Sequence, residues 1–141
     1  MGSSCDNHRK QQGEQQKEMK KMTNELKIYY TNNEFFCMGA EDTDVTDMAK
    51  THHELPQVAI DGLPTEVISA YVNAGMVKEC LDVIFRIMNN YTSNPLSHEQ
   101  DNGMQAWVRS VRTHTSMSVG DVVQINGTHW FCDHVGWTRI D

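Results

Sequence analysis

The sequence lacks any long hydrophobic run. No stretch of the 141-residue sequence approaches the roughly 18 consecutive apolar residues that a membrane-spanning helix needs. Its first residues are polar and have no apolar core of the kind found in secretory signals. We therefore expect a soluble cytoplasmic protein, and the length fits a single domain with one core.

Cysteine is scarce and widely scattered. The four cysteines, at positions 5, 37, 80 and 132, form no C-x-x-C pair. A secreted disulfide scaffold would show denser spacing. The sequence therefore predicts reduced thiols in a reducing compartment.

The common catalytic and nucleotide-binding motifs are also absent. The chain contains no G-x-x-x-x-G-K-S/T, G-x-G-x-x-G, G-x-S-x-G or H-E-x-x-H pattern. We therefore predict a protein that is not an enzyme and uses no cofactor.

Basic residues are rare in the middle of the chain. Residues 34–82 carry ten acidic side chains against two basic ones, and the net charge of the whole sequence is −7. Such a body repels the phosphates of nucleic acid. The charge suits solubility or a basic protein partner.

The sequence divides into a polar tail and one domain. Residues 1–23 are rich in Gln, Lys and Glu and bury too little surface to offset the entropy of ordering, so we predict a disordered tail before a domain at 24–141. Residues 26–30 and 35–38 predict a hairpin of two strands. Residues 39–54 predict an acidic loop with a short helix from Asp44, and residues 55–62 predict an extended segment.

Helical spacing is clearest between Pro64 and Met88. Pro64 suits a first helical turn, and two apolar stripes follow it, one on each side of Gly75. Gly75 either separates two helices or is bridged within one helix. Residues 104–111 fit a helical turn or a strand equally well.

The C-terminal segment predicts a hairpin. Residues 118–125 and 128–133 read as strands joined by Asn126-Gly127, the preferred pair for a type I′ turn. Counting from the turn puts Val123 opposite Trp130 on one face, where we expect Trp130 to be a core anchor. Residues 135–140 add a third strand. The predicted fold is α+β, a small antiparallel sheet of N-terminal and C-terminal hairpins packed against one or two helices.

The same segment carries a family resemblance. Its Ser-Met-Ser-Val-Gly-Asp-Val-Val run at 116–123, its Asn126-Gly127 turn and its Val-Gly-Trp at 135–137 resemble the S-L/M-S-V-G-D-V…G-F/W signature of small uncharacterised phage, plasmid and integrative-element proteins, including YodL-like domains. The resemblance covers about the last 60 residues. It implies a mobile-element origin and no established chemistry.

Histidine and cysteine gather near the C-terminus. His129, Cys132 and His134, with His114 nearby, are zinc-ligand types, but a strand turns His129 away from the other two. We therefore expect no metal site. Cys132 could also act as a nucleophile beside His134 or His114, but we favour a small buried thiol.

Four residues form the candidate ligand site: Trp107, Arg109, Arg112 and Trp137. Arginine beside aromatic rings holds a phosphate or stacks on a base. Two arginines are too few for a nucleic-acid groove, but they suit one phosphate of a nucleotide-like ligand.

Two functional hypotheses follow. The first is a phage or mobile-element accessory protein that binds a host protein in the host cytoplasm, for host takeover or against host defence. The alternative is a small nucleotide-ligand or nucleic-acid binding module that uses Arg109, Arg112 and Trp107. The sequence leaves self-association open.

Overall fold

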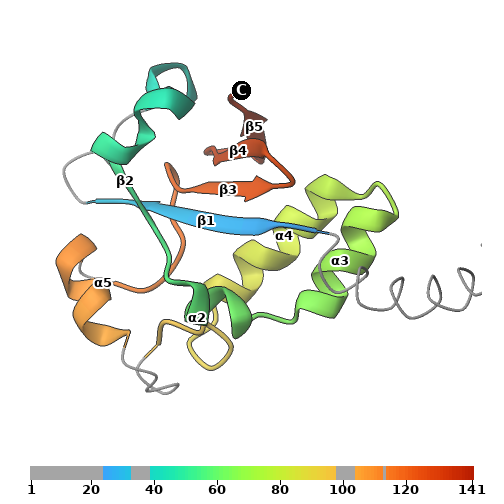
Figure 1. Cartoon of the computed structure of the whole chain (residues 1–141), viewed down its shortest axis with the longest axis horizontal. Helices are drawn as coiled ribbons and strands as arrows, with labels where there is room; N and C mark the ends of the chain where they lie inside the picture. Colours follow the sequence, from blue (N-terminus) through green and yellow to red (C-terminus); the bar gives the residue numbers. More distant parts are fainter. Residues whose placement is uncertain (1–23, 33–38, 98–103, 113) are drawn as a thin grey trace, which may run out of the picture.

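A computed structural model describes residues 24–32, 39–97, 104–112 and 114–141 (Figure 1). In this part of the chain, antiparallel strands form one sheet in the order β2-β1-β3-β4-β5. The strands are β1 (Leu26–Thr31), β2 (His52–Glu54), β3 (Val122–Ile125), β4 (Thr128–Cys132) and β5 (Trp137–Arg139). Helices pack on the sheet, so the predicted α+β class is confirmed.

The predicted C-terminal hairpin is confirmed with its register. Val123 lies opposite Trp130 across β3 and β4, and β5 supplies the third strand. The first strand begins at Val122, later than position 118. Residues 118–121 form a turn instead, in which the Ser118 N–H donates to the Asp121 carboxylate (2.7 Å).

The N-terminal strand lies inside the sheet. β1 pairs with β3 on one side and with β2 on the other. The strand predicted at 35–38, and the tail predicted at 1–23, lie outside the described residues. Because β3 pairs with β1, the C-terminal hairpin lies directly beside the N-terminal strand.

The helices are α2 (Gln57–Asp61), α3 (Thr65–Asn73), α4 (Val77–Met88) and α5 (Gln105–Val111). Pro64 precedes α3 as predicted, and Gly75 separates α3 from α4 with a φ of 77°. None of the described helices is long and apolar enough to cross a bilayer.

One local prediction needs revision, and one open choice is resolved. The segment at 55–62 was predicted to be extended, but it forms α2, because a helical turn after Pro56 buries the neighbouring side chains of Ala59 and Ile60. Residues 105–111 are helical, which resolves the choice between helix and strand.

Both faces of the sheet are covered. The amphipathic helix α4 buries Cys80, Leu81, Ile84 and Met88 in the main core. On the opposite face, the 3-10 helix η3 (Val45–Lys50) contributes Met48 to a smaller cluster with Val122 and Phe131, and Ala40 of the 3-10 helix η2 (Ala40–Asp42) packs against it. Figure 1 shows these two groups of helices on opposite sides of the strands.

The turn between β3 and β4 gives a first test. Asn126 and Gly127 have φ values of 50° and 88°, as a type I′ turn requires. We expect Gly127→Val to lower the free energy of unfolding by about 1–3 kcal/mol, because a β-branched residue resists positive φ. Urea unfolding measures the loss. Gly127→Asn should be milder, since Asn tolerates this conformation, and equal losses for the two variants would contradict the explanation.

Candidate functional site

Arg112, a predicted ligand residue, lies in the interior. It is 2% exposed, and its Nη2 lies 2.5 Å from Oδ2 of Asp121, whose side chain is also fully buried. The guanidinium group stacks on Tyr30, 3.8 Å from the ring centroid. The charge of Arg112 is therefore engaged by Asp121 and Tyr30 in the interior of the protein.

Asp121 is the centre of a buried polar network. It accepts hydrogen bonds from the backbone N–H of Thr31 (3.0 Å) and of Ser118 (2.7 Å) as well as from Arg112. Burial raises the pKa of Asp121 to about 6, although Arg112 and the hydrogen bonds act to lower it. The network fastens the segment before β3 to the end of β1.

His52 extends the network to β2. Its Nε2 lies 2.7 Å from the carbonyl oxygen of Gly120, and its Nδ1 lies 2.8 Å from the Thr51 hydroxyl. These contacts suit the neutral ring. Burial lowers the pKa of His52 below 6.5, and the nearby charge of Arg112 adds to this effect.

This lowered pKa predicts a pH dependence of stability. The unfolded chain protonates His52 at a higher pH than the folded chain, so the stability that neutral His52 supports is lost as the pH falls through 6.5. We expect His52→Gln to show a shallower loss of stability between about pH 7 and pH 5. Urea unfolding across this range compares the two proteins. Because Asp121 and His114 titrate in both, the difference isolates His52, and parallel curves would contradict the prediction.

The other predicted ligand residues lie in different places. Trp107 is half-buried on α5, with its ring 6.4 Å from that of Tyr30. Arg109 is exposed two residues later. An extended chain would have put these two side chains on one face, but the helix turns them apart.

Trp137 packs elsewhere, against α4. Its ring meets Phe85 edge-on at 6.4 Å, and its Nε1 donates to Oδ1 of Asp82 (3.2 Å). The structure thus brings Trp107 and Arg112 together on Tyr30, and it places Trp137 in a separate contact.

Cys132 is the buried thiol that we favoured. It is 4% exposed. Burial, with the charges of Asp121 and Asp133, raises its pKa to about 12. Such a thiol is a weak nucleophile at neutral pH. Among the described residues, no group of three or more His, Cys, Asp or Glu side chains is arranged to hold a metal ion.

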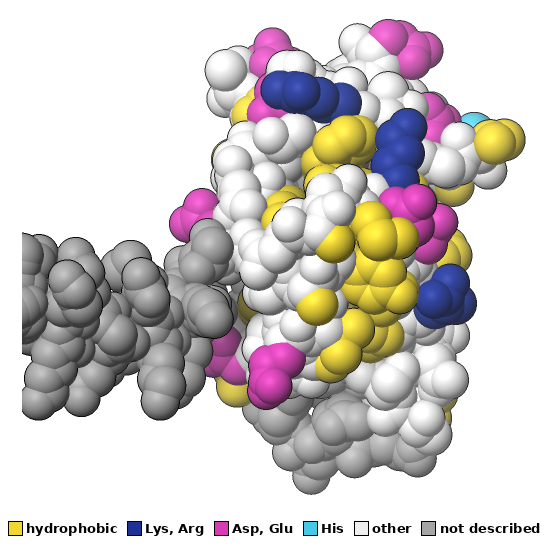
Figure 2. All heavy atoms as spheres, turned by 90° about the vertical axis from the view of Figure 1, so that its right-hand side faces the viewer, with side chains coloured by type: hydrophobic (Ala, Val, Ile, Leu, Met, Phe, Trp, Pro, Cys, Tyr) yellow, Lys and Arg dark blue, Asp and Glu magenta, His cyan; other side chains and the backbone are white. Residues whose placement is uncertain are grey.

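The surface gives no support to a nucleic-acid groove on the face drawn in Figure 2. Lys and Arg side chains on this face lie apart from one another, and Asp and Glu side chains lie among them. A groove that tracks a phosphate backbone needs a continuous positive stripe.

The outer edge of β5 is open. The Cys132 N–H donates to the carbonyl of Asp121, and the Cys132 carbonyl accepts from the N–H of Gly120. The backbone groups of Cys132 therefore point toward the β3 side of β4, and those of the next residue along the strand, Phe131, point the other way, toward Thr138 of β5. The backbone groups of Trp137 and Arg139 therefore point away from the sheet, and no described residue bonds to them. We call these outward groups the β5 edge.

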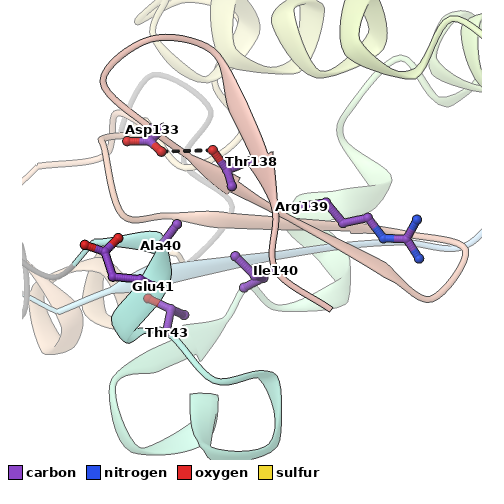
Figure 3. Close-up of a pocket in the computed structure, with 7 residues that line it drawn as sticks. All are labelled: Ala40, Glu41, Thr43, Asp133, Thr138, Arg139 and Ile140. Carbon is purple, nitrogen blue, oxygen red and sulfur yellow. Dashed lines mark hydrogen bonds between the residues drawn. The ribbon is translucent and has the colours of Figure 1, made fainter.

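A hollow lies on each side of the β5 edge. The first hollow, of about 480 Å³, lies between η2 and β5 (Figure 3) and is lined by Ala40, Glu41, Thr43, Asp133, Thr138, Arg139 and Ile140. The second hollow, of about 170 Å³, lies toward α4 and is lined by Asp82, Phe85, Cys132, Asp133, His134, Gly136 and Trp137. Asp133 borders both.

Carboxylates dominate the charge at these hollows. Asp133 accepts hydrogen bonds from the His134 N–H and from the Thr138 hydroxyl, each 2.9 Å (Figure 3), and these bonds lower its pKa. Glu41 lies on the same side of the first hollow as Asp133, whereas the guanidinium of Arg139 points away from both carboxylates. Asp82 adds a negative charge at the second hollow.

The sequence alone does not reveal this site. It predicts the strand at 135–140, but the strand order, which makes β5 an edge, is a property of the folded sheet. Locally, the sequence indicates only that a short strand follows the turn at Gly136.

The comparisons with known proteins are sparse. No protein-family model matches the sequence, and no solved structure matches it. An uncharacterised protein of Acanthamoeba polyphaga mimivirus is 41% identical over 64 residues, which is 45% of this chain and 56% of that protein. The chain thus matches little more than half the length of this relative. It is similar to a viral protein, in keeping with the predicted viral or mobile-element character.

Proposed function

We propose that this protein is a viral or mobile-element accessory protein that binds a host protein in the host cytoplasm through the β5 edge. The observation that carries the proposal is the open β5 edge, formed by the outward-facing backbone groups of Trp137 and Arg139, with a hollow on each side. An extended segment that joins a sheet gains backbone hydrogen bonds from the edge and selectivity from flanking pockets.

The form of β5 is consistent with selective binding. The strand is only three residues long and carries the charged Arg139, and both properties limit indiscriminate pairing between sheet edges. Selectivity then falls to the side chains that line the hollows.

A pull-down from host lysate tests this proposal. We expect the wild-type protein to enrich a host protein at near-stoichiometric level. Arg139→Pro should lose it, because proline removes one outward N–H donor and is tolerated on an edge strand. Arg139→Ala is the matched control, since it removes the side chain but keeps the N–H. If no protein is enriched, or if Arg139→Pro retains it fully, the proposal fails.

The alternative, a nucleotide-ligand module, has weaker support. It requires Arg112 to contact the ligand, and Arg112 is engaged by Asp121 and Tyr30 in the interior. Titration of indole fluorescence with nucleotides tests it. Saturable quenching that Arg109→Ala abolishes would favour the alternative.

A further inference from the structure

We infer that the segment bound at the β5 edge is extended and basic, with two adjacent Lys or Arg residues, one for each hollow. This inference rests on the proposed function and names the chemistry of its partner.

The alternation of side chains along a strand fixes the geometry. Thr138 belongs to the sheet face that contains Phe131, and Trp137 belongs to the face that contains Cys132. The two hollows therefore flank β5 on opposite faces. In a strand added beside β5, neighbouring residues point to opposite faces, so one side chain enters each hollow.

The first hollow suits a cation. Glu41 and Asp133 supply two carboxylates, and Asp133 is held in place by its bonds from His134 and Thr138. A carboxylate that is already oriented loses less freedom when it pairs with a cation. An ammonium or guanidinium group is the chemical complement of this arrangement.

The second hollow suits an arginine. Asp82 accepts the Trp137 bond on Oδ1, and its Oδ2 has no hydrogen-bond partner among the described residues. Phe85 and Trp137 line the same hollow. A planar guanidinium group can stack on an aromatic ring while it pairs with a carboxylate.

Charge also argues against a second copy of the chain as the occupant. Each copy carries a net charge of −7, so two copies repel one another at long range. A basic segment is attracted by the same charge.

The test uses a synthetic peptide, Thr-Val-Lys-Arg-Val-Thr, with blocked ends and a fluorescent label. We expect saturable binding in an anisotropy titration. Asp82→Asn and Glu41→Gln should each weaken it about tenfold, the effect of losing one charged hydrogen bond. Glu66→Gln, a charge change on exposed α3 away from both hollows, is the matched control. Equal weakening by Glu66→Gln would show general charge attraction and overturn the inference.

Backbone readouts distinguish strand addition from charge alone. Bound peptide should slow amide hydrogen exchange at Trp137 and Arg139, while Thr138, which already faces β4, stays unchanged. A peptide N-methylated on alternate residues should not bind. Binding by the methylated peptide, or dimerisation of the protein alone in sedimentation, would overturn the inference.

The outcomes separate the two proposals. If the pull-down yields a host protein that Arg139→Pro loses, but the basic peptide does not bind, the inference about chemistry fails and the proposed function stands. If the peptide binds as described and no host protein is captured, the proposed function fails while the binding preference of the β5 edge is established.

Discussion

Replacing Arg112 by Ala is expected to lower the free energy of unfolding by about 3–5 kcal/mol, because the change leaves Asp121 charged or protonated in the interior without its partner. Both side chains are fully buried, and their atoms lie 2.5 Å apart. A domain of this size has roughly 5–15 kcal/mol in total. Urea unfolding should therefore show that Arg112→Ala is poorly folded or has little stability left.

Two variants make this expectation specific to the buried pair. Arg109→Ala, on the exposed face of α5, should change stability by no more than about 0.5 kcal/mol. The double variant Arg112→Met with Asp121→Leu should lose less than the sum of the two single losses, since it removes both charges together. It should not be neutral, because the Thr31 and Ser118 N–H groups lose their acceptor. Wild-type stability for Arg112→Ala would contradict a buried ion pair.

Replacing Phe131 by Ala should also cost about 3–5 kcal/mol, through lost burial and the cavity left behind. Phe131 is 1% exposed and packs with Val122 and Met48 between the sheet and η3. The cluster has three buried members, so few side chains can shift to fill the cavity that the substitution leaves.

Trp130→Ala should cost less than Phe131→Ala. The expectation of Trp130 as a core anchor is right about its face, because it packs against the main core. However, Trp130 is only partly buried, whereas its neighbour Phe131 is enclosed. Urea unfolding of both variants decides the order. A larger loss of unfolding free energy for Trp130→Ala than for Phe131→Ala would contradict the prediction that Phe131 is the more deeply buried of the two.

The predictable parts of the fold are those that short segments determine. The pair Asn126-Gly127 specifies its turn, and the turn specifies the register of Val123 and Trp130. The apolar stripe of α4 likewise predicts its buried face. By contrast, β1 finds its neighbours through contacts such as that of Tyr29 with Gln124, 95 residues apart, which no local pattern encodes.

The candidate site was hidden for similar reasons. Arg112 reads as a surface cation beside aromatic residues, and only the folded chain shows that Asp121, nine residues later, neutralises it. The five-residue helix α2 is too short for its periodicity to outweigh its β-branched residues. The β5 edge depends on which strand ends the sheet, and that follows from the whole topology.

The central position of β1 has a consequence for folding during synthesis. β1 leaves the ribosome about a hundred residues before its strand partner β3 and the hairpin that follows. Until then, β1 can pair only with the three-residue strand β2, and Ile28 and Tyr30, both buried in the finished protein, lack the rest of the sheet. The sheet therefore assembles only after its last strands are translated, and pairing over such a sequence distance makes folding slow.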